Sequence, residues 1–282
     1  MGRSVRVRAP AKLNLALAVV GKRPDGYHEL RSVFATLDLA DDVRVATHRR
    51  LEVRNSADIG AGADLAARAV QVLAGAAGRE AHAFVRIRKR IPLAAGLGGG
   101  SSDAGAVLRA LAGLWGVDAD VVAVAAAVGS DVPFFASGAP FAFVSGRGER
   151  VRALPRPSQP LHAVVLRPTL RLATADVFAE LAPGDRGASH HVDALVAAFE
   201  AGAVTPLLLR AHAANDLLGP ATRCCEAISA WRAAAAERGI PLFLTGSGPT
   251  LFAIADDRRD ALRIARILVR AGLRAHAYTL AV

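Results

Sequence analysis

The chain has 282 residues and a formal net charge of +10 at pH 7, with 35 lysine and arginine residues against 25 aspartate and glutamate residues. This length suggests about two domains. The two cysteines are adjacent in sequence, which excludes a disulfide framework and a cysteine zinc site. The chain has no uncharged apolar run of about 18 residues and no apolar signal segment. We therefore expect a cytoplasmic globular protein.

The first predicted elements are strands. Polar and apolar residues alternate over residues 5–8 and 12–19, and residues 30–39 form a further extended run. An Asp-Gly step within residues 23–29 favours a turn between the last two strands. Apolar residues at helical spacing then predict a helix over residues 65–76.

A strand over residues 83–89 leads into a glycine-rich loop, and helices are expected over about 102–114 and 119–128. Residues 154–160 hold three prolines and form the best candidate linker. Besides several alanine-rich helices, the later predicted elements are a strand at 162–166, a strand near Leu242, a turn at 245–250, a helix at 256–270 and a strand at 274–280. Strands and helices without strict alternation indicate an α+β protein with two domains, residues 1–155 and 156–282.

The strongest functional signal is PLAAGLGGGSSD, residues 92–103. Glycines let the backbone approach a ligand closely, and successive N–H groups followed by a helix N-terminus favour phosphate. Ser101, Ser102 and Asp103 are residue types that cap helices. The segment matches neither a Walker A loop nor a Rossmann fingerprint, which argues against P-loop NTPases and nicotinamide dehydrogenases. The alternative interpretation is a flexible turn before an ordinary helix cap.

Two charged residues form a candidate catalytic pair. In the strand APAKLNLAL, a period of two places Lys12 and Asn14 on one face beside small alanines, which leaves space for a ligand. Asp131, in GSDVPFF, lies in an apolar segment where a charge is costly unless it is paired. Lys12 at about 4 Å would hold Asp131 ionised and able to accept a proton. The alternatives are a solvated lysine and a capping or salt-bridging aspartate.

A second glycine-rich turn, LTGSGPT, occupies residues 244–250 between two predicted strands. One interpretation is a plain hairpin turn. The other is a source of backbone donors and hydroxyl groups for the same phosphate or substrate. The residue pattern alone does not decide between them.

Together these segments resemble the GHMP small-molecule kinases. APAKLNL, GLGGGSS and TGSGPT are similar to the three motifs of that family. KLNLALAVVGKRPDGYHEL, GLGGGSSDA and GSDVPFF are similar to the members that phosphorylate an alcohol carrying cytidine diphosphate. The resemblance covers nearly the whole chain and is weakest over residues 183–210. It implies an ATP-dependent kinase with a ribosomal-S5-like N-terminal domain and a ferredoxin-like C-terminal domain.

The resemblance also implies roles for individual residues. Asp131 would accept the proton from the attacking hydroxyl, and Lys12 would stabilise the charges at the reacting groups. Lys89 would lie near the nucleotide. The ATP-phosphate loop would comprise Pro92, Leu93, Ala94, Ala95, Gly96, Leu97, Gly98, Gly99, Gly100, Ser101 and Ser102.

On the substrate side, the resemblance implies that Tyr27 stacks on the cytidine ring and that His28 meets the edge of the base. Phe178 would form the second stacking face, although Ala175 in that segment stands where the family has a proline. Asn14 would contact the substrate near the reacting hydroxyl. The second turn would contribute Gly246, Ser247 and Gly248.

The implied cofactors are ATP and Mg²⁺. The sequence offers no dedicated carboxylate set for the metal, so we expect Mg²⁺ to arrive with ATP, with Ser102 as one candidate contact. Asp64 stands where the family has an asparagine near the adenine. The partner would be a small molecule, with no nucleic acid and no membrane, and the protein would be a monomer or a homodimer.

Two alternative functions remain. Another GHMP kinase, for homoserine or phosphomevalonate, is less favoured because the Tyr27–His28 pair suits a nucleobase. The basic excess suggests RNA binding, with an arginine stripe on the last helix at Arg259, Arg263, Arg266 and Arg270. The opposite face of that helix is apolar at Leu262, Ile264, Ala265 and Leu268. Since only three basic residues are lysines (Lys12, Lys22 and Lys89), we interpret the arginines as compositional bias and solvated surface.

Overall fold

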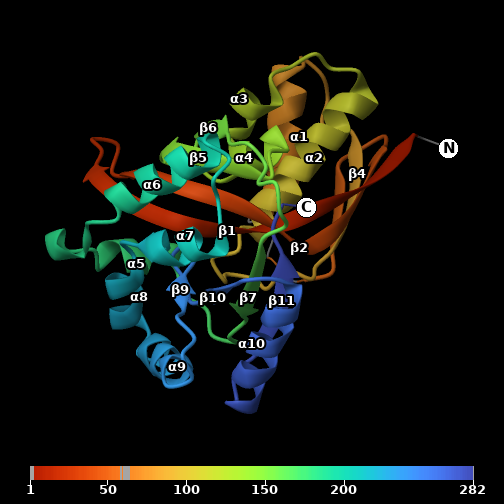
Figure 1. Ribbon diagram of the computed structural model, residues 1–282. Helices are drawn as coiled ribbons and strands as arrows, with labels where there is room; N and C mark the ends of the chain where they lie inside the picture. Colours follow the sequence, from red (N-terminus) through yellow and green to blue (C-terminus); the bar gives the residue numbers. More distant parts are fainter. Residues whose placement is uncertain (1–2, 58, 60–63, 282) are drawn as a thin grey trace.

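The computed structural model describes residues 3–57, 59 and 64–281 (Figure 1). Its frame is a long twisted ribbon in which β1 (Ser4–Lys22) pairs antiparallel with β2 (His28–Thr47). The expected strands over 5–8 and 12–19 are one continuous strand, with a register shift between Pro10 and Lys12. Proline cannot donate to a ladder and occurs in sheets mainly at such irregularities, and a bulge of this kind changes the direction of the side chains that follow.

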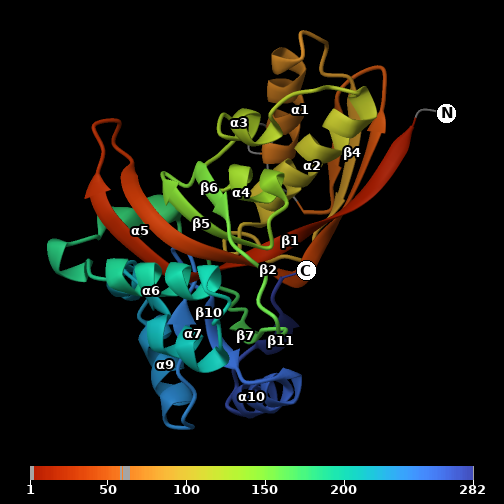
Figure 2. The same ribbon diagram turned by 45° about the horizontal axis from the view of Figure 1, so that its top comes forward.

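The first sheet has the order β3-β4-β2-β1-β8, with β5 also paired to β2 and β6 paired to β5. Its remaining strands are β3 (Glu52–Asn55), β4 (Ala83–Arg88), β5 (Phe141–Gly146), β6 (Arg150–Ala153) and β8 (Ala214–Asn215). Helices α1 (Leu65–Ala76), α2 (Gly99–Trp115), α3 (Val121–Ala125) and α4 (Val132–Ser137) lie together above the sheet in Figure 2. Apolar residues of β2 and β4, among them Val43 and Ile87, bury their side chains against α1 and α2.

Helix α2 corrects one prediction. It begins at Gly99, three residues before the expected start at Ser102, and its N-cap is Gly98 in the left-handed conformation, with φ of 69° and no side-chain cap. Ser101, Ser102 and Asp103 therefore lie inside the helix and do not cap it. The left-handed conformation of Gly98 turns the chain into the helix at this point. The loop therefore ends three residues before the serines and aspartate that are favoured as helix caps.

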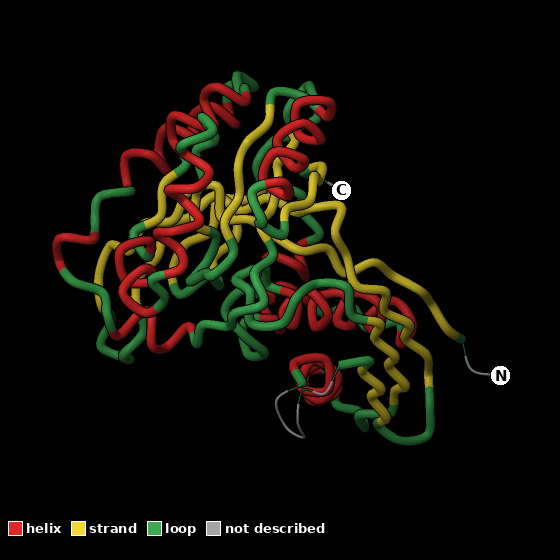
Figure 3. Tube along the Cα trace, turned by 90° about the horizontal axis from the view of Figure 1, so that it is seen from below, coloured by secondary structure: helices red, strands yellow, loops and turns green. Residues whose placement is uncertain are grey.

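The second sheet has the order β11-β7-β10-β9, formed by β7 (His162–Leu166), β9 (Phe243–Leu244), β10 (Leu251–Ala255) and β11 (Ala275–Thr279). Helix α10 (Arg258–Arg270) packs on this sheet and buries Ile264, Ala265 and Leu268 as expected, but Leu262 is exposed. The other helices are α5 (Thr174–Ala179), a short 3₁₀ helix (Pro183–Asp185), α6 (Ser189–Glu200), α7 (Pro206–His212), α8 (Leu218–Cys224) and α9 (Ala227–Ala236). Two mainly antiparallel sheets together with helices confirm the α+β class, and Figure 3 shows the helices in red around the strands in yellow.

The predicted linker at residues 154–160 contains neither helix nor strand and connects β6 to β7. The two halves of the chain nevertheless meet closely. Strand β8 pairs with β1, and one apolar cluster combines Leu13 of β1 with Val165 of β7 and Phe252 of β10. The boundary between residues 155 and 156 stays a prediction. In the described ranges, no helix is long and apolar enough to cross a membrane.

Candidate active site

A cavity of about 310 Å³ lies where β1, the glycine loop, the start of α4 and the turn at residues 245–250 meet. Most of the predicted site residues line it: Lys12, Asn14, residues 92–101, Asp131, Phe178, Gly246 and Ser247. These segments are far apart in sequence and come from both sheets. The fold therefore brings the glycine loop, the candidate catalytic pair and the second turn to one place.

Lys12 and Asp131 face each other in this cavity. The Nζ atom of Lys12 lies 3.5 Å from Oδ2 of Asp131, and the side chains are 4% and 31% exposed. Lys12 Nζ also donates to Asn14 Oδ1 at 2.5 Å and lies 4.6 Å from the centre of the Phe34 ring. Burial lowers the pKa of the Lys12 ammonium, and the charge of Asp131 opposes that shift. Asp131 keeps the more accessible side chain, as a group that exchanges a proton with a ligand must.

The glycine loop reaches Lys12 by close backbone approach. The Lys12 N–H donates to the carbonyl oxygen of Leu97 at 3.0 Å, which ties the loop to β1. A Cβ atom on Gly98 would lie 3.0 Å from the Phe135 ring and 3.1 Å from Cγ of Lys12. A Cβ atom on Gly96 would lie 2.5 Å from the carbonyl oxygen of Thr245. Because Gly96 and Gly98 have no Cβ atom, the loop can approach this closely and place the N-terminus of α2 at the cavity. The free N–H groups of that helix end favour an anion.

Asn14 joins β1 to the second turn. Its Oδ1 accepts the N–H of Gly246 at 2.8 Å, and its own N–H donates to Thr245 Oγ1 at 2.9 Å. Its Nδ2 donates to Ser32 Oγ at 2.9 Å. The side chain of Ser247 in turn shares a hydrogen bond of 3.0 Å with Thr174. Asn14 therefore holds the turn beside Lys12 while it lines the cavity.

The three residues expected to bind the cytidine ring, Tyr27, His28 and Phe178, contact other side chains in the structure. The His28 ring stacks on the Phe178 ring, with 5.0 Å between centroids and 21° between planes. Tyr27 is 52% exposed and lies under the guanidinium of Arg147, 4.9 Å from its centre. One face of Phe178 is thus covered by His28. Burial, with the charges of Lys22 and Arg186, lowers the pKa of His28.

Five predicted site residues do not line the cavity: Lys89, Ser102, Tyr27, His28 and Gly248. Ser102 is 1% exposed, and its hydroxyl donates to the carbonyl oxygen of Pro10 at 2.6 Å. That hydroxyl bonds to the backbone of β1, and Ser102 does not line the cavity. Its contact with the metal stays a prediction. Asp64 accepts the N–H of Ala66 at 2.8 Å and caps α1, and the side chain of Asn55 donates to it.

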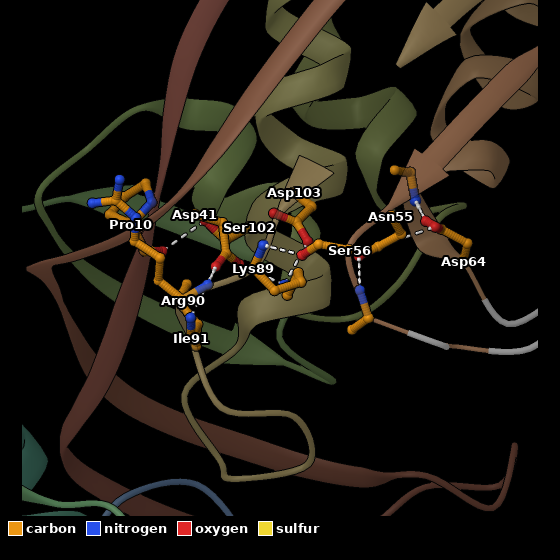
Figure 4. A network of polar contacts seen from close by, with 12 residues as sticks. Pro10, Asp41, Asn55, Ser56, Asp64, Lys89, Arg90, Ile91, Ser102 and Asp103 are labelled. Atoms are coloured by element: carbon orange, nitrogen blue, oxygen red, sulfur yellow. Dashed lines mark hydrogen bonds and ion pairs between the residues drawn. The ribbon is translucent and has the colours of Figure 1, made fainter. Parts of the chain in front are cut away.

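Lys89 occupies a buried cluster that sequence reasoning missed (Figure 4). Its Nζ atom donates to Oδ2 of Asp41 at 2.5 Å and to Oδ2 of Asp103 at 2.6 Å. Burial disfavours the charged form of Lys89, but the carboxylates of Asp41 and Asp103 favour that form more strongly. The pKa of the Lys89 ammonium is therefore raised. Burial and the charge of Asp41 raise the pKa of Asp103 to about 7, against the opposing effect of Lys89. Along β2, Asp41 falls on the same alternate positions as the apolar residues Leu37, Leu39 and Val43, all of which are buried. Because side chains two positions apart on a strand point the same way, this spacing could have predicted that Asp41 is buried too.

The residues around the cavity do not form a binding site for Mg²⁺ made by the protein alone. Among its lining residues Asp131 is the one carboxylate. The described part of the chain has no group of three or more His, Cys, Asp or Glu side chains that could hold a metal ion. Hard cations of this kind need several oxygen ligands, which the ATP phosphates and water can supply.

Comparisons with known proteins agree with this geometry. A family model of the GHMP kinases N terminal domain matches residues 64–139, and one of the GHMP kinases C terminal domain matches residues 195–274. A 4-diphosphocytidyl-2-C-methyl-D-erythritol kinase of Thermus thermophilus is 38% identical, with 96% of this chain and 95% of the relative covered. The chain belongs to the GHMP kinase family.

Solved structures extend this likeness to three dimensions. A crystal structure of 4-(cytidine 5'-diphospho)-2C-methyl-D-erythritol kinase is 37% identical, has a TM-score of 0.80 and covers 99% of this chain and 100% of its own. A homoserine kinase from Cytophaga hutchinsonii has a TM-score of 0.72 at 20% identity, over 98% of this chain and 94% of its own, which shows a shared fold alone. This GHMP kinase is therefore a two-domain, ATP-dependent small-molecule kinase, as the sequence motifs predicted.

Proposed function

We propose that this GHMP kinase transfers the γ-phosphoryl group of ATP to the 2-hydroxyl of 4-diphosphocytidyl-2-C-methyl-D-erythritol, a step of the methylerythritol phosphate route to isoprenoid precursors. The observation that carries the proposal is the Lys12–Asp131 pair at 3.5 Å beside the glycine loop. The names of relatives that align over nearly the whole chain support the choice of substrate. The enzyme would work in the cytoplasm as a monomer or a homodimer.

In the proposed reaction, Asp131 accepts the proton of the substrate hydroxyl. The hydroxyl oxygen forms a bond to the γ-phosphorus while the bond from that phosphorus to the bridging oxygen of ADP breaks. Lys12 lies in a buried position where its charge is poorly screened, so it stabilises both the carboxylate and the charge on the transferred group. Phosphoryl transfer depends mainly on such positioning and electrostatic stabilisation.

The loop and the second turn hold the two substrates in this proposal. Residues 92–101, with the N-terminus of α2, bind the ATP phosphates, accompanied by Mg²⁺. Asn14 holds Gly246 and Ser247 at the acceptor side of the cavity. The cytidine ring binds at the far end of the β1–β2 ribbon, where Tyr27 and Phe178 stack on it and His28 meets its edge. His28 covers one face of Phe178, so in this proposal the base stacks on the other face of that ring.

The test compares acceptors and one matched pair of variants. The enzyme should phosphorylate the cytidine-diphosphate alcohol and leave homoserine and mevalonate essentially unchanged. Asp131→Asn should lower kcat by about 10²–10⁴-fold with little change in ATP affinity, since it removes the base. Lys12→Arg, which keeps the charge but not the compact shape, should also lose most of the activity.

Asp120→Asn is the control, because Asp120 also precedes a short helix, where it accepts N–H groups of α3, but lies outside the cavity. This variant should keep the parent's kcat. Turnover of homoserine or mevalonate equal to that of the cytidine alcohol would contradict the proposed substrate. Near-normal kcat in Asp131→Asn would remove that residue from the mechanism.

A further inference from the structure

The two ends of the glycine loop converge on the cluster formed by Asp41, Lys89 and Asp103 (Figure 4). On the incoming side, Oδ1 of Asp41 accepts the backbone N–H groups of Arg90 at 2.5 Å and Ile91 at 2.8 Å. These residues lead directly into Pro92, where the loop begins. The exposed fractions of Asp41 and Asp103 are 0% and 1%.

On the outgoing side, Asp103 lies in the second turn of α2, the helix that starts at Gly99. Lys89 bridges the two sides, because its Nζ atom contacts both carboxylates. The same Nζ atom lies 3.3 Å from the place that a Cβ on Gly99 would take. The N–H of Lys89 is itself held by Ser56 Oγ at 2.8 Å.

Between these anchor points the backbone adopts conformations that it does not favour on its own. Ala94 has a φ of 49°, in the left-handed region that side chains with a Cβ atom rarely adopt, and Gly96 and Gly98 also have positive φ. Such conformations persist only where the surrounding structure holds them. The bond from the Lys12 N–H to the Leu97 carbonyl oxygen holds the middle of the loop, and the contacts of Asp41, Lys89 and Asp103 hold its two ends.

We propose that Asp41, Lys89 and Asp103 are positioning residues that join the two ends of the glycine loop and so set its shape for ATP, and that Lys89 does not bind the nucleotide itself. This inference deepens the proposed kinase function and rests on it for the role of the loop. It replaces the expectation that Lys89 contacts ATP, because the side chain is 7% exposed and its ammonium group is already bonded to two carboxylates.

Removing Asp103 distinguishes the two roles of Lys89. If Lys89 were an ATP ligand, Asp103→Leu would remove one of the two carboxylates that compete with ATP for its ammonium group, and affinity for ATP would stay equal or rise. If the cluster positions the loop, Asp103→Leu and Lys89→Met should both weaken binding of a non-hydrolysable ATP analogue, by about 10-fold or more. Asp103→Asn keeps an oxygen at the place where Lys89 donates, and should restore affinity to within about threefold of the parent.

Calorimetric titration with the ATP analogue measures these affinities on the full chain without any acceptor alcohol. The outcome is therefore independent of whether the cytidine alcohol is the substrate. Leu268→Ala is the control for loss of stability, because Leu268 is fully buried against the second sheet, away from the loop. It should lower Tm and leave the affinity unchanged.

Two results would overturn the inference. One is an affinity for the analogue in Asp103→Leu that equals or exceeds that of the parent. The other is an equal loss in Asp103→Leu and Asp103→Asn, since a shared oxygen contact could then not be the cause. If Lys89→Met fails to fold, the comparison between the two Asp103 variants still decides the question.

Discussion

Lys12 and Lys89 are both buried, yet their surroundings give their ammonium groups opposite properties. Lys12 faces one partly exposed carboxylate at 3.5 Å, and burial lowers its pKa. Lys89 contacts two buried carboxylates, which raise its pKa. An ammonium group that contacts a neutral amide oxygen and faces one carboxylate at 3.5 Å can still act on a ligand. An ammonium group shared between two close carboxylates instead holds the fold together. Burial alone therefore does not distinguish a catalytic lysine from a structural one.

At the same scale, Asp103 makes stability depend on pH. Its pKa is about 7 in the folded protein, against an ordinary value of 3.8. The folded state thus binds this proton more tightly than the unfolded state, and the contribution to stability is complete below about pH 4 and is lost as pH rises through about 7. We expect Asp103→Asn to flatten the dependence of stability on pH between 5 and 8.

Urea denaturation of the parent and of Asp103→Asn at several pH values measures this effect. Burial also lowers the pKa values of some histidines, such as His28 and His276. They are present in both proteins and cancel in the difference. A difference between the two proteins that does not change with pH would show that Asp103 titrates normally.

At the scale of elements, the site depends on how closely the glycine loop approaches the second turn. Gly96 belongs to the loop and Thr245 to the turn between β9 and β10, and their backbones leave no room for a Cβ atom. Asn14 of β1 ties that same turn to the strand that carries Lys12. Three elements thus keep their relative positions through backbone contacts, and a small insertion at one of them displaces the others.

Gly96→Ala tests this close approach. The new Cβ would lie 2.5 Å from the Thr245 carbonyl oxygen at a φ of 75°, so we expect a loss of stability of about 2–4 kcal/mol and a higher KM for ATP. Gly272→Ala is the matched control, with a φ of 80° but nothing within 4 Å of the added atom. It should cost only the backbone strain of about 1–2 kcal/mol. Chemical denaturation and steady-state kinetics measure both variants, and equal losses would contradict the steric argument.

At the scale of the whole molecule, part of the net charge of +10 lies in a row of arginines on the first sheet. On the exposed face of the first sheet, Arg6 is paired with Arg44 across β1 and β2, and Arg44 with Arg86 across β2 and β4. Arg86 is in turn paired with Arg54 of β3. Like charges directly opposite each other destabilise a sheet. The fold tolerates this row because guanidinium groups in solvent are screened by salt.

Arg44 lies in the middle of this row and offers a graded test. Arg44→Gln removes two repulsive pairs, and Arg44→Glu replaces them with attractive ones, so stability should increase in the order Arg, Gln, Glu, by about 1 kcal/mol in total. Thermal unfolding at low and high salt measures the effect, which should shrink as salt increases. A lower stability of Arg44→Glu than of the parent at low salt would refute the account.

Much of the fold follows from local patterns in the sequence. Alternation identified β1, an extended run over residues 30–39 identified part of β2, and helical spacing identified α1 and α10. Lys12 and Asn14 are two residues apart on β1, so they were expected on one face of the strand, and both line the cavity. Local patterns could not indicate β8, because its two residues carry no periodicity and it forms only by pairing with β1.

The parts of the candidate site that lie in one continuous segment of sequence were predicted. The parts that depend on contacts between distant segments were missed. The loop, Asp131 and the second turn were visible as motifs, and the cavity contains them. The proximity of Lys89 to the loop in sequence suggested a nucleotide contact, but only the packing of β2 against α2 shows that Asp41 and Asp103 surround it. The stacking of His28 on Phe178 likewise joins residues 150 positions apart and has no local signature.

The burial of two of the three lysines has a practical consequence. Lys12 and Lys89 are shielded from reagents, with side chains 4% and 7% exposed, while Lys22 is exposed at the end of β1. An amine-reactive fluorophore would therefore label Lys22 in preference to the other two lysines. Lys22 pairs with His28 across the ribbon, so the dye would sit beside the aromatic side chains at that end and could report, by a change in emission, when a nucleobase arrives there.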